Sequence, residues 1–433
     1  MKQKIATTAL MLAMSAVMVM AQEQPAEATS EATQVTLREA VQNALQYSKQ
    51  LQASRYDREL YYQKVREARS GNIPQANTSL TGTTYFGKEL NLGGMPIKMA
   101  NTVTLSAGVS WTLSAQSIVG VKIAKISQQL IDEQVAQNEL NVKANVIDTY
   151  YALLIYKRNL EILNGNMADM DEIYRHTCNM YAQGVVEATD TAQMYVTVMT
   201  LRNTIISVER SMETTKRLLV LQMGLPIDTK IQPVGNLEDF IGESTTATLE
   251  QSSFDVEKNY DYRLLELSSE INERTVKLYK WAYAPTLTAA YQYSNALKGG
   301  FMNFDHVGTL TLSWNLFNGF KREAQVKEAK IEVERAKTNM SLLQDNLQTN
   351  DEQLRYNINT AIDAYLLQTE NLRVAKQVLE NYKNKYKEGV LSSLELTQAN
   401  SNYLSAETSY ASACLELLTA HTQLSKLYNN FSY

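Results

Sequence analysis

The 433-residue sequence predicts a mainly α-helical protein with a β portion, built as two tandem helix–strand–strand–helix repeats. Three observations lead to this fold class. Residues 97–225 and 286–433 contain no proline. Proline in a helix interior costs about 3 kcal/mol, so both stretches favour long helices. Several segments recur about 205 residues further along the chain, and four short stretches alternate apolar and polar residues as half-buried strands do.

The first 21 residues predict a secretory signal peptide. Two lysines precede an apolar run over 9–20, which leads into the cleavage pattern Val19-x-Ala21. The run is too short to span a membrane as a helix. We therefore expect an exported protein whose mature chain begins with a tail over 22–34.

Charge and composition exclude several classes of function. The 41 lysines and arginines against 46 acids give a net charge of −5, whereas nucleic-acid-binding proteins carry a basic surplus. Two cysteines and three histidines are too few for a metal cluster or a disulfide framework. We expect no cofactor, and Cys178 and Cys414 to be unpaired. The sequence holds no phosphate loop or nucleophile elbow, so an enzyme is not expected.

Matched segments define the repeats. Ser110-Trp111 corresponds to Ser313-Trp314, and MYAQGVV over 180–186 corresponds to KYKEGVL over 385–391. These matches place the first repeat at 35–223, a connector at 224–260 and the second repeat at 261–433. The connector holds two of the six prolines.

Helical arms with coiled-coil spacing flank each Tyr-x-x-Gly segment. In the last arm, ten apolar or small residues from 396 to 427 keep the alternating spacing of 3 and 4 that gives knobs-into-holes packing. The stretch 116–182 predicts about 100 Å of nearly continuous helix. Gly184 and Gly389 predict hairpin tips, because glycine adopts the left-handed conformation that ends a helix.

Strands are predicted at about 76–86, 102–113, 286–295 and 307–317. In 102–113 every second residue is apolar, from Val103 to Leu113, and most of the others are serine or threonine. Twelve residues suffice for a tilted membrane-spanning strand, which needs about 9–11. An apolar face opposite a hydroxyl face fits a strand between lipid and water. It equally fits a half-buried strand of a soluble protein.

The number of strands indicates an oligomer if the strands enter a membrane. Open sheet edges are not tolerated in hydrocarbon, because each unpaired backbone group costs several kcal/mol. Single-chain outer-membrane barrels begin at about 8 strands, so four strands cannot close alone. Three chains with four strands each would supply twelve.

With these features, the chain resembles the TolC-like outer-membrane efflux proteins. The resemblance rests on the duplicated module, the paired Tyr-x-x-Gly tips, and the segments DYRLLELSSEINERTVKLYKWAYAPTLTAAY and SWNLFNGFKREAQVKEAKIEVERAK. It implies a homotrimer with one shared 12-stranded β-barrel in the outer membrane of a Gram-negative cell and a long α-helical barrel in the periplasm. The trimer would contact outer-membrane lipid and act as a passive exit duct for a periplasmic adaptor and an inner-membrane pump of RND, ABC or MFS type.

The resemblance also implies functional residues at the tips. The expected adaptor-binding residues are Tyr181, Gly184, Val185, Val186, Gly389, Val390 and Leu391. Tyr386 matches a tyrosine that bonds to an aspartate, here Asp190, and holds the aperture shut. Leu391 stands where the same relatives carry an arginine that reinforces this contact. Glu395 matches a carboxylate that forms a charged ring in the pore.

Simpler interpretations remain open at this stage. Asp190 and Glu395 lie in the first turns of helices, where acids are favourable through the helix dipole alone. Trp111, Trp314, Tyr291 and Tyr293 are expected at the membrane interface, although a buried sheet would also accept them. The alternative function is an exported coiled-coil structural or adhesin-like stalk with no transport role, which would be soluble without detergent.

Overall fold

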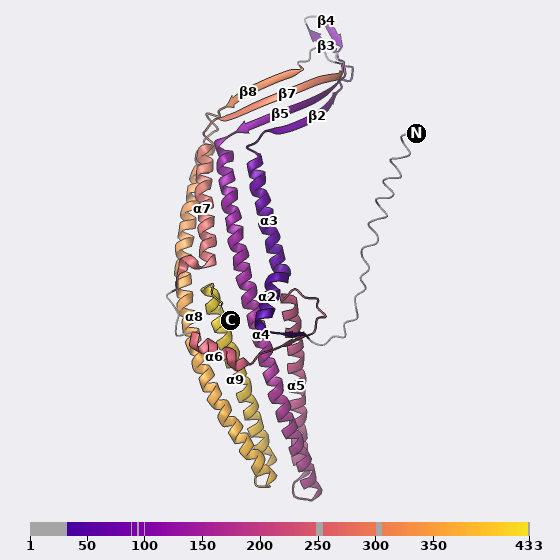
Figure 1. Ribbon diagram of the computed structural model, residues 1–433, viewed down its shortest axis with the longest axis vertical. Helices are drawn as coiled ribbons and strands as arrows, with labels where there is room; N and C mark the ends of the chain where they lie inside the picture. The colour runs from indigo at the N-terminus through magenta and orange to yellow at the C-terminus, as the bar shows by residue number, and fades with distance from the viewer. Residues whose placement is uncertain are drawn as a thin grey trace, which may run out of the picture.

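The computed structural model describes residues 33–87, 89–92, 95–98, 100–247, 254–299 and 305–431. The predicted signal peptide and residues 22–32 of the expected tail lie outside this part of the chain. The described molecule is elongated, with a sheet at one end and two long helical hairpins that reach the other (Figure 1). No helix in the described residues is long and apolar enough to cross a membrane.

Four long helices form the two hairpins. The first hairpin consists of α4 (Ala115–Ala182) and α5 (Ala188–Gln222), and the second of α8 (Lys321–Lys387) and α9 (Ser393–Leu427). α4 has 68 residues and α8 has 67, which is about 100 Å each, and α5 and α9 have 35 residues each. The long helix predicted over 116–182 is confirmed, and the matching lengths confirm the tandem repeat.

Two shorter helices lead into the sheet. α3 (Lys49–Ser70) follows α2 (Leu37–Tyr47) and packs on α4, and α7 (Tyr260–Trp281) packs against α4 and α8 (Figure 1). α3 and α7 have 22 residues each and occupy the same place in their repeats. Each ends just before a proline, Pro74 or Pro285, which has no N–H with which to continue a helix.

A four-stranded antiparallel sheet forms the end of the molecule opposite the turns of the two long hairpins (Figure 1). Its order is β2 (Gln75–Thr83), β5 (Thr102–Leu113), β7 (Thr286–Lys298) and β8 (His306–Ser313). The central β5–β7 pair joins the first repeat to the second. β2 and β8 are the two edges.

The register gives the sheet one apolar and one hydroxyl-rich face. Val109 of β5 lies opposite Ala76 of β2 and Tyr291 of β7, and the apolar residues of each strand continue this face. On the other face, hydroxyl groups meet across β5 and β7. Ser106 Oγ lies 3.3 Å from Ser294 Oγ, and Thr112 Oγ1 lies 3.2 Å from Thr288 Oγ1. The alternation predicted from the sequence is therefore confirmed.

The strand ends differ from the predicted ones for local reasons. β2 stops at Thr83 rather than 86, because the left-handed Phe86 (φ 49°) and Gly87 (φ 73°) turn the chain. β7 continues three residues beyond 295. β8 ends at Ser313 rather than 317, because Ser313 pairs with Thr286, the first residue of β7. Residues 314–317 have no strand beside them to extend the ladder.

Several elements have no counterpart in the sequence prediction. β3 (Glu89–Leu92) and β4 (Met95–Lys98) form a hairpin between β2 and β5. β1 (Thr33–Val35) pairs in parallel with β6 (Ile231–Pro233). Such short strands show too few residues for a period to be recognised.

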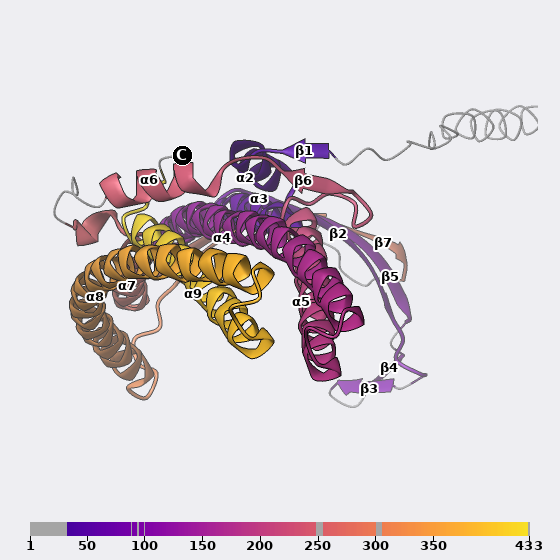
Figure 2. The same ribbon diagram turned by 90° about the horizontal axis from the view of Figure 1, so that it is seen from below.

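The described residues of the connector between the repeats form part of the fold. It holds β6, α6 (Leu237–Ala247) and the 3₁₀ helix η2 (Val256–Lys258). Figure 2 shows α2, β1, β6 and α6 grouped on one side of α4. The Tyr150 hydroxyl of α4 accepts a hydrogen bond from Val234 N (3.1 Å) and lies 3.0 Å from the carbonyl oxygen of Val35. This contact ties the start of the chain and the connector to the long helix.

The buried apolar residues form two clusters. One lies where α2, α6 and the upper part of α9 meet α4, and it includes Tyr150 and Leu417. The other lies nearer the tips and includes Met170, Leu201 and Leu396. All ten residues of the seam predicted over 396–427 are buried, which confirms the coiled-coil interpretation of α9.

Candidate functional site

The two hairpin tips have the same backbone design. In the first tip, Gly184 N donates to Tyr181 O (2.9 Å) and Val185 N donates to Met180 O (2.9 Å). In the second tip, Gly389 N donates to Tyr386 O and Val390 N donates to Lys385 O, each at 3.0 Å. Gly184 and Gly389 both have φ +75°. This pair of bonds is the Schellman motif, which ends a helix with a left-handed residue.

Reciprocal capping boxes begin the outgoing helices. Glu187 caps α5 together with Asp190, and Ser392 caps α9 together with Glu395. Glu395 Oε2 accepts from the Ser392 hydroxyl (2.7 Å) and from Ser392 N (3.0 Å). These hydrogen bonds, the one from the hydroxyl first, lower the pKa of Glu395. Glu395 is therefore an ionised acid at the tip, as a charged ring requires, and a cap of its own helix at the same time.

The equivalent tyrosines of the two tips differ in environment. Tyr181 is 50% exposed, whereas Tyr386 is 2% exposed and belongs to the tip cluster. The Tyr386 hydroxyl lies 2.8 Å from Thr177 Oγ1, and that oxygen donates its own proton to Ile173 O (2.8 Å). Tyr386 is thus the donor to Thr177. Burial is the main cause that raises the pKa of Tyr386, which keeps the donor protonated.

The expected hydrogen bond between Tyr386 and Asp190 does not form in this conformation. Asp190 Oδ2 accepts from Glu187 N (3.1 Å), and Asp190 Oδ1 accepts from the Ser393 hydroxyl of the other tip. Both carboxylate oxygens therefore accept hydrogen bonds from other donors, and the Tyr386 hydroxyl donates to Thr177 instead. Asp190 still links the two hairpins, but its partner is Ser393. Leu391, in the position of the missing arginine, packs partly buried against the tip cluster.

Ion pairs that the sequence analysis missed also join the hairpins. Lys383 of α8 is 7% exposed, and its Nζ lies 2.5 Å from Asp169 Oδ2 of α4 and 3.0 Å from Glu380 Oε1. Lys387 Nζ lies 2.6 Å from Glu172 Oε1 of α4. The sequence spacing could have indicated that Lys383 is buried, because Lys383 lies at a coiled-coil seam position between the buried residues Leu379 and Tyr386.

A match to a protein-family model identifies the family of this chain. The model of the outer membrane efflux protein family matches residues 21–225 and 277–430. The chain belongs to this family. None of the curated proteins compared with the chain matches it in sequence.

Solved channels share the fold of this efflux protein. They include the CmeC outer membrane channel of Campylobacter jejuni, at 17% identity and a TM-score of 0.74 over 90% of this chain and 85% of that one. The open state of the MtrE outer membrane channel of Neisseria gonorrhoeae has 16% identity and a TM-score of 0.72, over 91% and 89%. The outer membrane protein VceC of Vibrio cholerae has 14% identity and a TM-score of 0.73, over 92% and 97%.

These findings confirm the fold class and the outer-membrane location. The family and its structural neighbours are channel proteins, so this efflux protein is an exit duct rather than an exported stalk. Its helical part extends into the periplasm, and the strand end belongs to the outer membrane.

At the strand end of this efflux protein, two tryptophans hold equivalent junctions. Trp111 Nε1 donates to Asn72 O, and Trp314 Nε1 donates to Tyr283 O, each at 2.9 Å. Each carbonyl belongs to the residue two places before the junction proline, Pro74 or Pro285. The tryptophans therefore stabilise the junction between helix and strand in both repeats. Their expected role at the membrane interface stays a prediction.

The two expected interface tyrosines lie further along β7, on the apolar face. The Tyr291 hydroxyl lies 2.7 Å from His306 Nδ1, and the ring of Tyr293 is 5.1 Å from that of His306. Tyr291 is 51% exposed. The apolar face thus carries tryptophan at its helix end and a cluster of tyrosine and histidine nearer its outer end, and the histidine was not predicted.

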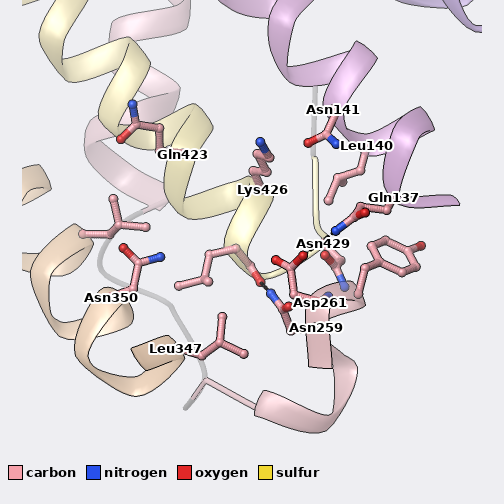
Figure 3. Close-up of a pocket in the computed structure, with 13 residues that line it drawn as sticks. Gln137, Leu140, Asn141, Asn259, Asp261, Leu347, Asn350, Gln423, Lys426 and Asn429 are labelled. Atoms are coloured by element: carbon pink, nitrogen blue, oxygen red, sulfur yellow. Dashed lines mark hydrogen bonds between the residues drawn. The ribbon is translucent and has the colours of Figure 1, made fainter. Parts of the chain in front are cut away.

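A cavity of about 470 Å³ lies where α4, α7, α8 and α9 meet (Figure 3). Its walls carry hydrogen bonds that join these helices. Asn259 Nδ2 donates to Leu427 O (3.1 Å), and Gln137 Nε2 donates to Asp261 Oδ1 (2.5 Å). None of the predicted site residues lines it. Cys178 and Cys414 are both unpaired, as expected.

Proposed function

We propose that three copies of this efflux protein form an outer-membrane duct that passively conducts substrates from a periplasmic adaptor and an inner-membrane pump to the exterior. The duct serves a tripartite efflux or a type I secretion system, with a pump of RND, ABC or MFS type. Within the described chain, the amphipathic four-stranded sheet with two open edges is the observation that carries the proposal.

The sheet supports a trimer through its unpaired edges. β2 and β8 each have one row of backbone groups without a strand partner in the described chain. Such edges cannot lie in hydrocarbon, and about 8 strands is the smallest single-chain barrel. Three chains give twelve strands and close every edge. The apolar face then meets lipid, and the hydroxyl face lines the lumen.

The lumen at the strand end is expected to select weakly among substrates. Over the paired length of β5 and β7, the hydroxyl face carries serine, threonine, glycine, alanine and glutamine, and no charged residue. A neutral polar wall holds water without attracting one sign of charge. Discrimination by charge therefore falls to the tips, where Glu395 is the candidate.

The tips support a role as a closable aperture. Polar contacts link the hairpins here, among them Tyr386 with Thr177, Ser393 with Asp190, Lys383 with Asp169, and Lys387 with Glu172. Water can replace the partners in these contacts when the hairpins separate, and the buried apolar tip cluster lies beside them. We expect opening to move the α8–α9 hairpin away from the α4–α5 hairpin. The exposed Val185 (63%) and Val390 (70%) offer apolar contacts to an adaptor.

Detergent extraction tests the assembly. The protein should leave outer membranes only with detergent, run as a trimer by light scattering, and form ion-conducting channels in planar bilayers. A monomer that is soluble without detergent would contradict the duct.

The aperture role of Glu395 has a separate test. Glu395→Gln keeps the capping box, since glutamine serves there as well as glutamate, but removes the charge. Cation selectivity in bilayers should fall in this variant and stay unchanged in Glu334→Gln, an exposed acid of α8 far along the chain from the tip. Unchanged selectivity in both variants would remove Glu395 from the aperture.

A further inference from the structure

The contact between the two hairpins contains polar layers inside an otherwise apolar seam. Asn166 of α4 donates from Nδ2 to Asn400 Oδ1 of α9 at 2.9 Å, and the two residues are 5% and 2% exposed. α4 runs toward the tips and α9 runs away from them (Figure 1). One heptad further from the tips, the antiparallel register brings Asn159 of α4 level with Glu407 of α9.

Glu407 is a buried acid, and one of its carboxylate oxygens has no donor. It is 5% exposed, and its Oε1 has no hydrogen-bond partner. The buried Oδ1 of Asn159 also lacks a partner. An ionised carboxylate only accepts hydrogen bonds, whereas a protonated one also donates. An ionised carboxylate with a buried, unpaired oxygen is costly, and protonation removes that cost and gives Glu407 a hydrogen to donate. One buried donor nearby, Arg158 Nε, also lacks a hydrogen-bond partner.

The charges around Glu407 do not form an ion pair with it. Arg158 of α4 bonds to Glu238 of α6, and its guanidinium lies 4.9 Å from the Tyr410 ring centroid. Arg158 and the exposed Lys376 of α8 favour the ionised form of Glu407 at longer range. Burial outweighs both and raises the pKa of Glu407 above its usual 4.5. Among the other titratable groups, Tyr403 and Cys414 of α9 interact with Glu407. The acids Glu380 of α8 and Asp169 of α4 lie near Tyr403.

We propose that Glu407 is a proton-binding site in the seam between the hairpins, and that opening of the duct releases this proton. The proposal rests on the proposed movement of α8–α9 away from α4–α5. Separation of α4 from α9 hydrates the carboxyl group, which then returns to the acidity of an ordinary glutamate. Because binding linkage is reciprocal, protons stabilise the closed seam.

The direction of the pH dependence follows from the raised pKa. Below pH 4.5 the carboxyl is protonated in both states and favours neither. As the pH rises from 4.5 through the closed-state pKa, the closed seam loses stability relative to the open one. Each pKa unit of difference between the two states corresponds to about a tenfold change in the equilibrium per chain.

Infrared spectroscopy tests proton binding without reference to conduction. At pH 5.5 a glutamate with a pKa of 4.5 is about nine-tenths ionised. The detergent-solubilised protein should show the C=O stretch of protonated carboxyl groups at this pH, and Glu407→Gln should reduce that band. Asp148→Asn identifies the contribution of Asp148, a half-buried acid with a raised pKa. If Glu407→Gln does not change the carboxyl band, the site does not bind the proton.

Bilayer conductance tests the coupling. Open probability should rise between pH 4.5 and 7.5 in the wild-type protein and in the control Glu334→Gln, and the rise should be smaller in Glu407→Gln. Glu407→Leu provides a second neutral side chain if glutamine disturbs folding. A pH dependence as large as that of the wild-type protein in both Glu407 variants would overturn the coupling. Absence of any conductance would instead refute the duct and leave the infrared result to decide proton binding.

Discussion

Lys383 offers the sharpest test of how the tips are held together. Its amine is buried between Asp169 of the other hairpin and Glu380 of its own helix, at 2.5 Å and 3.0 Å. Lys383→Met keeps a long, flexible side chain in the seam and removes only the charge. We expect the variant to fold and to open more readily.

The magnitude follows from the exposure of the partners. The side chains of Asp169 and Glu380 are 50% and 54% exposed, so water can solvate both when the amine is gone. The loss should therefore resemble a partly exposed pair, about 1 kcal/mol per chain, rather than the 3–5 kcal/mol of a fully buried one. If three tips open together, the total of about 3 kcal/mol shifts the equilibrium roughly 150-fold toward the open state.

Single-channel recording at neutral pH measures this shift as open probability. Lys337→Met is the matched control, because the ion pair of Lys337 lies within α8, with Glu334 at 2.9 Å, and Lys337 is exposed. The control should behave like the wild type. An open probability in Lys383→Met no higher than in the control would refute the role of this ion pair in closing the duct.

Three further predictions concern stability, each read from thermal or denaturant unfolding. Tyr386→Phe should cost about 1 kcal/mol because it removes a buried hydrogen bond, while Tyr181→Phe should cost little; equal losses would contradict the difference between the tips. Gly184→Ala should destabilise by about 1–2 kcal/mol through its left-handed φ, whereas Gly165→Ala, inside α4 with open space around it, should stabilise by up to about 1 kcal/mol; the opposite order would refute the backbone argument. Burial raises the pKa of Asp148 from 3.8 to about 6, so stability should fall as the pH rises through this interval. Asp148→Asn should remove that loss of stability, which is on the order of 1–2 kcal/mol at pH 7. An unchanged dependence of stability on pH in this variant would contradict the role of Asp148.

The elements with long periodic patterns could be predicted from the sequence almost completely. The ten-residue seam of α9 is buried throughout, and β5 has the predicted ends at 102 and 113. Both patterns repeat many times, so a single misjudged residue changes nothing. Short elements such as β1 and β6 offer no period, and their pairing joins residues about 200 positions apart.

The tip contacts could be predicted only in part. The family resemblance indicated the turn glycines and the acids, and the turns form by local hydrogen bonds that the sequence spacing already implies. Tyr386 and Asp190 were expected to bond, but their donors and acceptors are satisfied by Thr177 and Ser393. Partner choice of this kind depends on differences of about an ångström between neighbouring helices, which no sequence spacing contains.

By itself, the sequence determined the repeat, the four long helices, the two hairpin tips and the amphipathic strands, because each depends on backbone preference and on periodicity within one segment. Only the tertiary structure decided what the equivalent residues of the two repeats do. Tyr181 and Tyr386 occupy the same place in the same turn, yet one is half exposed and the other is buried. The reason is that α8 packs against α4 through its tip while α4 turns its own tyrosine outward, so identical local signals meet different neighbours.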